Sequence, residues 1–216
     1  MREIYRPSSE LDIETKRRVL VDYFEKHAEV QNLEKGYIYA PWVNLEIDPV
    51  LQGIAADLVA SHFKDKRIDI VSGIPQYGVP FSAAIAERIE TVKLITSRKG
   101  LIYPPIFGNE VIVTDTSVSF TTGEKGFSFV FPSIIRQRVA EGKNHLLLVD
   151  DFCAKGDSAR AIIPSLQILG IEVSYAVYVA KIFQGGLGKI RQLGVDAYAV
   201  INIEALTPDK KIITRK

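Results

Sequence analysis

The chain has 216 residues, a hydrophobic fraction of 47%, and 27 Lys and Arg residues against 26 Asp and Glu residues. This length allows one domain with an appended segment and a substantial core. The formal net charge of +1 provides no general attraction for nucleic acid or for an anionic membrane. Any affinity for phosphate must therefore be local.

Cysteine usage and hydropathy favour a cytoplasmic protein without a membrane partner. The single cysteine, Cys153, cannot form a disulfide within the chain. The opening residues MREIYRP lack the apolar run of a signal peptide. No stretch approaches the roughly 18 uninterrupted apolar residues that a membrane helix needs.

The first 63 residues predict two helices separated by a strand. Residues 11–26 carry apolar side chains at amphipathic helical spacing, and we expect this helix to belong to a cap. Residues 37–43 are short and rich in aromatic residues, which favours a strand. Asp48 and Pro49 are an N-cap residue and a first-turn residue, and they predict a helix that continues to about residue 63.

The middle of the chain predicts short strands and a long loop. Strands are expected at residues 68–71 and 93–96, on either side of a helix at residues 81–89. Residues 100–115 contain Tyr-Pro-Pro and Gly-Asn and show no steady period, so they predict a loop that orders on binding. Residues 123–126 predict a hairpin or loop tip. The segments on either side of that tip are residues 116–122 and 127–131.

The last third of the chain alternates strands with helices, as an α/β fold with a parallel sheet requires. The predicted order is a strand ending at Asp150, a helix at residues 159–169, a strand at 173–180, a glycine-rich turn at 185–188, a short helix and a strand at 197–203.

Residues 146–158 join a buried strand to two carboxylates. Four consecutive apolar residues predict a strand that is covered on both faces. Asp150 and Asp151 follow at its carboxyl end, where ligands bind in open α/β sheets. Alternation along a strand should send the two side chains to different sides.

The turn after the acids is suited to a phosphate group. It offers small side chains, a glycine that permits close backbone approach, and Ser158 as a cap before the next helix. Free N–H groups at a helix N-terminus favour an anion. Carboxylates beside a phosphate are explained by ribose hydroxyls with Mg²⁺ nearby. The residues of this turn are Ala154, Lys155, Gly156, Asp157 and Ser158.

This pattern resembles the phosphoribosyl-pyrophosphate (PRPP) motif of the type I phosphoribosyltransferases. Residues 43–51, VNLEIDPVL, are similar to the amino-terminal segment of the bacterial xanthine enzymes, and residues 180–184, AKIFQ, resemble their Lys-x-Phe-Gln segment. Residues 97–99 and 117–121 resemble the start and the end of the mobile catalytic loop. Together these matches extend from about residue 44 to residue 204.

The resemblance implies a central, mostly parallel sheet flanked by helices, with a small hood and a mobile catalytic loop. Residues 1–43 would form an amino-terminal extension or hood, and residues 44–216 the phosphoribosyltransferase domain. A homodimer is also implied. The expected activity is Mg²⁺-dependent transfer of the phosphoribosyl group from PRPP to a purine base in purine salvage, with release of pyrophosphate.

In that reaction, Asp150 and Asp151 would hold ribose hydroxyls and would meet Mg²⁺ indirectly, through PRPP. Arg98 and Lys99, at the entry to the mobile loop, would close over the pyrophosphate. The turn at residues 154–158 would bind the ribose phosphate.

A second loop, residues 72–80, follows a strand and precedes a helix. The backbone N–H groups of its Gln76, Tyr77 and Gly78 would hold the pyrophosphate arm of PRPP.

Three residues are predicted to contact the base. Asn44 offers both a donor and an acceptor, and Lys181 offers only donors, which suits the carbonyl groups of a 6-oxopurine better than adenine. Phe183 would stack on the ring, although a phenylalanine after a strand is more often a core residue. Xanthine is the first candidate base, and hypoxanthine or guanine the next.

Two alternatives to a purine enzyme stay open. The Gly-Ile-Pro loop at residues 73–75 resembles orotate enzymes more than adenine or xanthine enzymes. Asp157 adds negative charge beside the phosphate, and Pro164 interrupts the following helix, so a PRPP-sensing regulator of the purine-repressor type is also compatible. Only 43 residues precede Asn44, with no basic recognition helix, so we expect no nucleic-acid partner.

Overall fold

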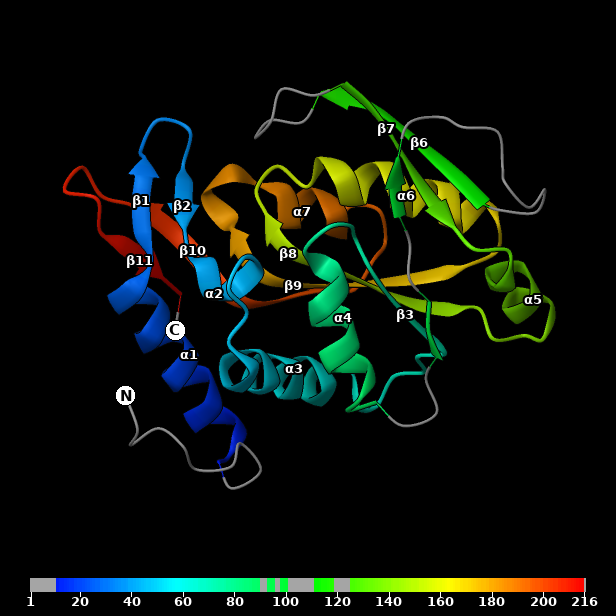
Figure 1. Cartoon of the computed structure of the whole chain (residues 1–216), viewed down its shortest axis with the longest axis horizontal. Coiled ribbons are helices and arrows are strands. Elements are labelled where there is room, and N and C mark those ends of the chain that lie inside the picture. Colours follow the sequence, from blue (N-terminus) through cyan, green and yellow to red (C-terminus); the bar gives the residue numbers. More distant parts are fainter. Residues whose placement is uncertain (1–10, 90–92, 96–97, 101–110, 119–124, 216) are drawn as a thin grey trace.

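The computed structural model describes residues 11–89, 93–95, 98–100, 111–118 and 125–215. A six-stranded sheet runs through the middle of the molecule in the order β11-β10-β9-β8-β3-β4 (Figure 1). All neighbouring strands pair in parallel except β10 and β11, which pair antiparallel. The strands are β3 (Ile70–Gly73), β4 (Lys93–Leu94), β8 (His145–Cys153), β9 (Glu172–Lys181), β10 (Ala197–Leu206) and β11 (Ile212–Thr214).

Helices cover both faces of this sheet (Figure 1). On one face lie α1 (Ile13–His27), α3 (Pro49–Phe63) and α4 (Gly78–Ala86), and on the other lie α6 (Asp157–Ile168) and α7 (Gly186–Arg191). Strand β8 contributes Leu147 and Val149 to the first core cluster and Leu146 and Leu148 to the second. The predicted α/β fold with a strand buried on both faces is confirmed.

Smaller elements surround the sheet. An antiparallel hairpin, β1 (Glu29–Asn32) with β2 (Tyr37–Tyr39), precedes the short helix α2 (Pro41–Asn44). A separate antiparallel sheet has the order β5-β7-β6 and lies on the α6 side of the molecule (Figure 1). Its strands are β5 (Arg98–Gly100), β6 (Val111–Val118) and β7 (Lys125–Phe131), and the remaining elements are α5 (Ile134–Ala140) and the 3₁₀ turn η2 (Ile182–Gln184).

Helix α1 is joined to the rest of the molecule by both apolar and polar contacts. Its Leu20 and Phe24 are buried in the same core cluster as α3. Lys16 Nζ lies 2.8 Å from a carboxylate oxygen of Asp57 on α3, and Arg17 donates a hydrogen bond of 3.1 Å to the hydroxyl of Tyr198 on β10. The division into residues 1–43 and 44–216 stays a prediction.

The start of α3 agrees with its sequence signal. The Asp48 carboxylate accepts hydrogen bonds from the backbone N–H groups of Val50 at 2.8 Å and Leu51 at 3.1 Å. Pro49 occupies the first turn, where a missing N–H costs nothing. The predicted helix that begins after Asp48 and ends at Phe63 is confirmed.

Several predicted boundaries were wrong. The strand expected at residues 37–43 ends at Tyr39, because Pro41, which has no N–H to give a sheet partner, begins α2 instead. Helix α4 begins at Gly78, three residues earlier than predicted, and ends at Ala86.

The loop predicted at residues 100–115 is partly wrong. Gly100 belongs to β5, and residues 111–115 belong to β6, which pairs with β7 from Val111 onward. The run Val-Ile-Val-Thr at residues 111–114 is rich in β-branched residues, which pack well on a pleated surface. Lys125 and Gly126, predicted in a turn, begin β7. Residues 101–110, 123 and 124 lie outside the described residues.

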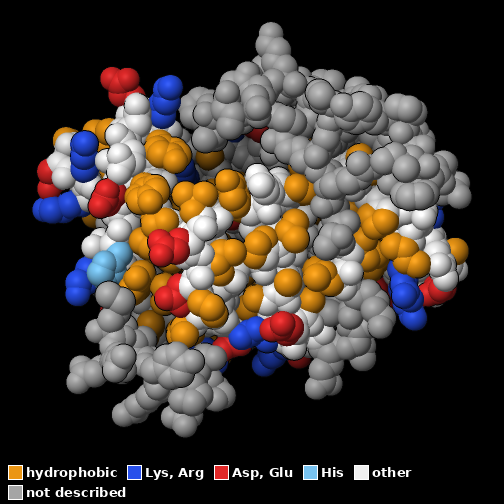
Figure 2. Space-filling model, viewed as in Figure 1, with side chains coloured by type: hydrophobic (Ala, Val, Ile, Leu, Met, Phe, Trp, Pro, Cys, Tyr) orange, Lys and Arg blue, Asp and Glu red, His pale blue; other side chains and the backbone are white. Residues whose placement is uncertain are grey.

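Helix α4 presents apolar side chains at the surface. Figure 2 shows hydrophobic side chains spread across the middle of this side of the molecule. The partly exposed positions of α4 are Val79, Pro80, Ala83, Ala84 and Ala86. Among the described helices, none is long and apolar enough to cross a membrane.

Candidate functional site

Strand β8 carries the two predicted acids near its carboxyl end, but it does not stop at Asp150. It continues to Cys153, because Phe152 and Cys153 still pair with Val179 and Ala180 of β9. Sequence alone predicted the end of this strand three residues too early. The acids therefore lie within a paired strand, whose neighbours fix the backbone that carries them.

Asp150 lies against a buried tyrosine. Its carboxyl oxygens accept a hydrogen bond of 3.2 Å from the hydroxyl of Tyr175 and one of 3.0 Å from the backbone N–H of Asp151. Burial raises the pKa of Asp150 well above its usual range, and the negative charge of Asp151 adds to this effect. Sequence reasoning missed Tyr175, which lies 25 positions further along the chain on β9.

Asp151 has its partner on α2. Asn44 Nδ2 donates a hydrogen bond of 2.8 Å to a carboxylate oxygen of Asp151. Tyr175 belongs to the core cluster beneath α6 and α7, whereas Asn44 lies on an element that precedes α3. The prediction that the two acids have different surroundings is confirmed, and Asn44 is brought to the same edge of the sheet.

The predicted phosphate turn leads from β8 into α6. Gly156 is the N-cap residue and has a left-handed conformation with φ of 74°. Ser158, expected as the cap, is instead the second helical residue, because the left-handed glycine begins the helix earlier. Asp157 occupies the first turn, where the helix dipole favours a negative charge, and lies 3.6 Å from Arg160 Nη1. Pro164 lies inside α6, which continues through it to Ile168.

Gly186, the first residue of α7, contacts the backbone of this turn. The backbone N–H of Gly186 donates a hydrogen bond of 3.0 Å to the carbonyl oxygen of Ala154. A Cβ atom on Gly186 would lie 2.4 Å from that oxygen and 2.6 Å from the carbonyl carbon of Lys155. The glycine-rich turn at residues 185–188 was predicted as a turn only. The backbone contact could not be deduced from spacing.

The second predicted phosphate loop folds onto β8 beside the acids. The N–H of Ile74 donates to the carbonyl oxygen of Val149 at 2.7 Å, and the N–H of Gly78 donates to the carbonyl oxygen of Ile74 at 3.0 Å. A Cβ atom on Gly78 would lie 2.5 Å from the Val149 oxygen and 3.2 Å from the Cα atom of Asp150.

Within this loop, the peptide bond between Pro75 and Gln76 is cis, and Tyr77 is exposed. The structure therefore brings both predicted phosphate loops to the end of one strand.

Lys181 links the end of β9 to the amino-terminal hairpin. Its ammonium group donates a hydrogen bond of 2.7 Å to the carbonyl oxygen of Gly36, in the loop between β1 and β2, and lies 5.6 Å from the centre of the Phe152 ring. Burial lowers the pKa of Lys181 to about 8, although the charge of Asp151 works in the opposite direction.

Phe183 is not a core residue, since 42% of it is exposed. It lies next to the same hairpin loop, because a Cβ atom on Gly36 would lie 3.2 Å from its Cζ atom. Lys181, Phe183 and Gly36 therefore meet near the ends of β8 and β9. The contacts of Gly36 with Lys181 and Phe183 could not be predicted from the sequence.

Arg98 and Lys99 are described only as backbone. They form part of β5 and pair with Val130 and Phe129 of β7. Their side chains, Ser97 and residues 119–121 of the expected mobile loop lie outside the described residues. Their roles stay predictions.

Cys153 lies at the end of β8, beside the acids. Burial, followed by the charge of Asp150, raises the pKa of its thiol to about 12. A thiol with this pKa stays protonated near neutral pH and is a poor nucleophile.

The donor set at the strand end fits an indirect metal contact better than a direct one. Hard cations such as Mg²⁺ prefer oxygen ligands, and Asp150 and Asp151 provide them. Among the described residues, no group of three or more His, Cys, Asp and Glu side chains could hold a metal ion. An ion here would need further oxygen ligands from a bound phosphate compound.

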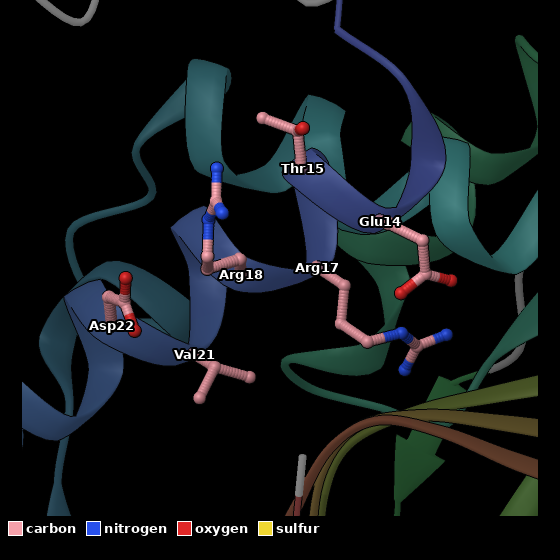
Figure 3. A pocket seen from close by; sticks show the side chains of 6 residues that line it. All are labelled: Glu14, Thr15, Arg17, Arg18, Val21 and Asp22. Carbon is pink, nitrogen blue, oxygen red and sulfur yellow. The ribbon is translucent and has the colours of Figure 1, made fainter.

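A groove elsewhere on the molecule does not include the predicted residues. Figure 3 shows the residues of α1 that line it. Its volume is about 500 Å³. Charged side chains of both signs line it: Glu14, Arg17, Arg18 and Asp22, together with Thr15 and Val21. None of these six residues is among those predicted to bind PRPP or the base.

Known proteins similar in sequence to this chain include xanthine phosphoribosyltransferases. The chain is 29% identical to a xanthine phosphoribosyltransferase of Bifidobacterium adolescentis over 155 residues, which is 71% of this chain and 76% of that protein. It is 29% identical to the xanthine phosphoribosyltransferase of Agathobacter rectalis over 76% of this chain and 81% of that protein. No family model matches the chain.

A solved structure extends the comparison to three dimensions. The adenine phosphoribosyltransferase of Trypanosoma brucei, in complex with AMP, pyrophosphate and ribose-5-phosphate, superposes with a TM-score of 0.65 at 18% identity. The match covers 89% of this chain and 83% of that one. The chain has the type I phosphoribosyltransferase fold. In this phosphoribosyltransferase fold, the turn before α6 and the loop after β3 meet at the end of β8 beside Asp150 and Asp151.

Proposed function

We propose that this protein is a purine phosphoribosyltransferase of nucleotide salvage. It transfers the phosphoribosyl group from PRPP to a ring nitrogen of a 6-oxopurine and releases pyrophosphate. Xanthine is the first candidate base, and hypoxanthine or guanine follows. The xanthine phosphoribosyltransferases among its relatives support this choice.

The observation that carries the proposal is the convergence of two phosphate loops on a pair of acids. PRPP has a phosphate at one end of its ribose and a pyrophosphate at the other. The turn from Ala154 to Ser158 would bind the first at the start of α6, and the loop with Gln76, Tyr77 and Gly78 would bind the second. Asp150 and Asp151, between these loops, would hold the ribose hydroxyls.

Catalysis would then rest on position and charge. Holding the base in line with the anomeric carbon removes much of the entropic cost of the reaction. Arg98 and Lys99 would stabilise the departing pyrophosphate. Mg²⁺, when PRPP carries it into the site, would neutralise part of the pyrophosphate charge. Asp150 and Asp151 would meet that ion only through PRPP.

Lys181 and Phe183 would form the base site together with the hairpin loop. The ammonium group of Lys181 offers donors to a purine carbonyl, and the exposed ring of Phe183 offers a surface for stacking. Asn44 would contact the base while its side-chain amide keeps its hydrogen bond to Asp151.

The test is pyrophosphate release from PRPP and Mg²⁺ with xanthine, hypoxanthine, guanine, adenine and orotate supplied singly. We expect turnover with a 6-oxopurine. Turnover with orotate alone would replace the purine assignment. Binding of PRPP in calorimetry, without turnover on any base, would move the protein to the class of PRPP-sensing regulators.

A paired substitution tests the acids. Asp150→Asn combined with Asp151→Asn should abolish transfer while circular dichroism stays unchanged, and unchanged kinetics in this variant would refute their role.

A homodimer and a cytoplasmic location remain predictions. Light scattering in solution would determine the oligomeric state.

A further inference from the structure

The hydroxyl of Tyr175 lies in the core of the protein, behind the candidate site. Tyr175 is fully buried on β9, at 0% exposure. Its hydroxyl donates a hydrogen bond of 3.2 Å to one carboxyl oxygen of Asp150, while the N–H of Asp151 donates one of 3.0 Å to the other oxygen. Both oxygens of Asp150 are therefore fixed from the protein side.

Tyr175 brings a polar group into an otherwise apolar part of the core. The neighbouring members of the same core cluster on β9, Val173 and Val177, are apolar and could fill such a space without a polar group. A buried hydroxyl must be hydrogen-bonded to avoid a cost of desolvation, and this one uses Asp150 as its acceptor. The tyrosine is thus tied to the orientation of that carboxyl group.

The two fixed contacts leave capacity for a ligand. An ionised carboxylate has about four lone-pair sites on its two oxygens. The hydroxyl of Tyr175 and the backbone N–H of Asp151 occupy two of them, and the side chain of Asp151 also interacts with the group. Without the tyrosine, only the backbone N–H of Asp151 would hold the carboxyl group, through one of its two oxygens. Held by Tyr175, it keeps its remaining lone pairs in one direction.

We propose that Tyr175 is a positioning residue that sets the orientation of Asp150 for the ribose hydroxyls of PRPP. This inference rests on the proposed function, since it assigns a role in PRPP binding. It predicts that the tyrosine acts through Asp150 and has no direct part in the reaction or in binding of the base.

The same strand provides a matched control. Tyr178, three residues further on, is also buried, at 1% exposure, and its hydroxyl donates a 3.2 Å hydrogen bond to the backbone carbonyl oxygen of Leu51. Tyr178→Phe removes a buried hydroxyl of the same kind without touching Asp150. Any effect that comes only from loss of a hydroxyl in the core should appear in both variants.

The experiment compares Tyr175→Phe and Tyr178→Phe with the unmodified protein. The KM for PRPP and the KM for the preferred base are measured, together with the Kd for PRPP by calorimetry and the melting temperature. For Tyr175→Phe we expect the KM and the Kd for PRPP to rise about tenfold, the scale of one lost hydrogen bond at a buried site. The KM for the base should not change, and Tyr178→Phe should leave all three constants unchanged.

A double-mutant cycle gives a second measurement. If Tyr175 acts through Asp150, then Tyr175→Phe should have no further effect on PRPP binding in an Asp150→Ala background. Full additivity of the two substitutions would overturn the inference. Equal behaviour of Tyr175→Phe and Tyr178→Phe would also overturn it.

Failure of the inference can be distinguished from failure of the proposed function. The unmodified protein decides the function, through turnover and PRPP binding. The difference between the two tyrosine variants decides the role of Tyr175, and calorimetry measures it even in a protein that binds PRPP without turnover.

Discussion

At the scale of single residues, Lys181 has the most informative chemistry. Burial disfavours its charged form and lowers its pKa from 10.5 to about 8, so the group still carries a proton at pH 7 and loses it as the pH rises through about 8. Its ammonium group donates to the carbonyl oxygen of Gly36, and in the proposed function it would also donate to the base.

We therefore predict that the KM for the base rises above about pH 8, whereas the KM for PRPP stays flat over the same range. The measurement is a pH series of initial rates for the unmodified protein and for Lys181→Met. The variant should have a raised base KM throughout and should lack the inflection. An inflection that persists in the variant would belong to ionisation of the base itself.

The sequence predicted which residues belong to the candidate site wherever a local sequence pattern marked them. Asp150 and Asp151 come directly after the apolar run of residues 146–149, and this local pattern revealed their place in the sheet. Tyr175 and Gly36 gave no such signal, because their partners lie 25 and 145 positions away and the contacts form only between assembled elements.

At the scale of elements, the short helix α7 contacts the turn at residues 154–158 through one glycine, Gly186. A side chain at Gly186 would collide with the backbone of residues 154–156. A Cβ atom on Gly188, two residues further on in the same helix, would have no neighbouring heavy atom within 4 Å among the described residues. The two glycines therefore differ in surroundings while sharing one helix.

We predict that Gly186→Ala raises the KM for PRPP by roughly tenfold or more, because the turn must move, and leaves the KM for the base nearly unchanged. Gly188→Ala should leave both constants unchanged and should stabilise the helix by up to about 1 kcal/mol, the difference in helix propensity. Steady-state kinetics and thermal melting of both variants provide the check. Equal kinetics for the two variants would remove Gly186 from the phosphate site.

Element types were more predictable than element ends. The buried strand β8 and the capped helix α3 have strong patterns, and both were found. The end of β8 was missed because Phe152 and Cys153 stay in the sheet only through their partners on β9. The start of β6 was missed because a stretch with Tyr-Pro-Pro and Gly-Asn precedes a β-branched run that begins at Val111.

At the scale of the whole molecule, the predicted extension and the sheet domain share one core. Phe24 on α1 and Phe81 on α4 are both fully buried in the same core cluster. Because these two side chains belong to one apolar cluster, α1 should not unfold separately from the sheet.

We predict that Phe24→Ala lowers the free energy of unfolding by about 3–5 kcal/mol, as large-to-small changes in a core do. Unfolding should remain a single transition in calorimetry, as it should in the control variant Phe81→Ala. A separate early transition for Phe24→Ala, with the main transition unchanged, would show that residues 1–43 form an independent unit.

The contact between α1 and the last strand also has a consequence for the time course of biosynthesis. Thr214 of β11 donates a backbone hydrogen bond of 3.2 Å to the carboxylate of Glu25, 189 positions earlier in the chain. At about 5–20 residues per second, a ribosome needs roughly 10–40 s to reach one partner from the other. During that interval Leu20 and Phe24 of α1 can already pack against α3, which belongs to the same core cluster and is made much earlier than β11. The contact between Glu25 and Thr214 can therefore form only after almost the whole chain has been made.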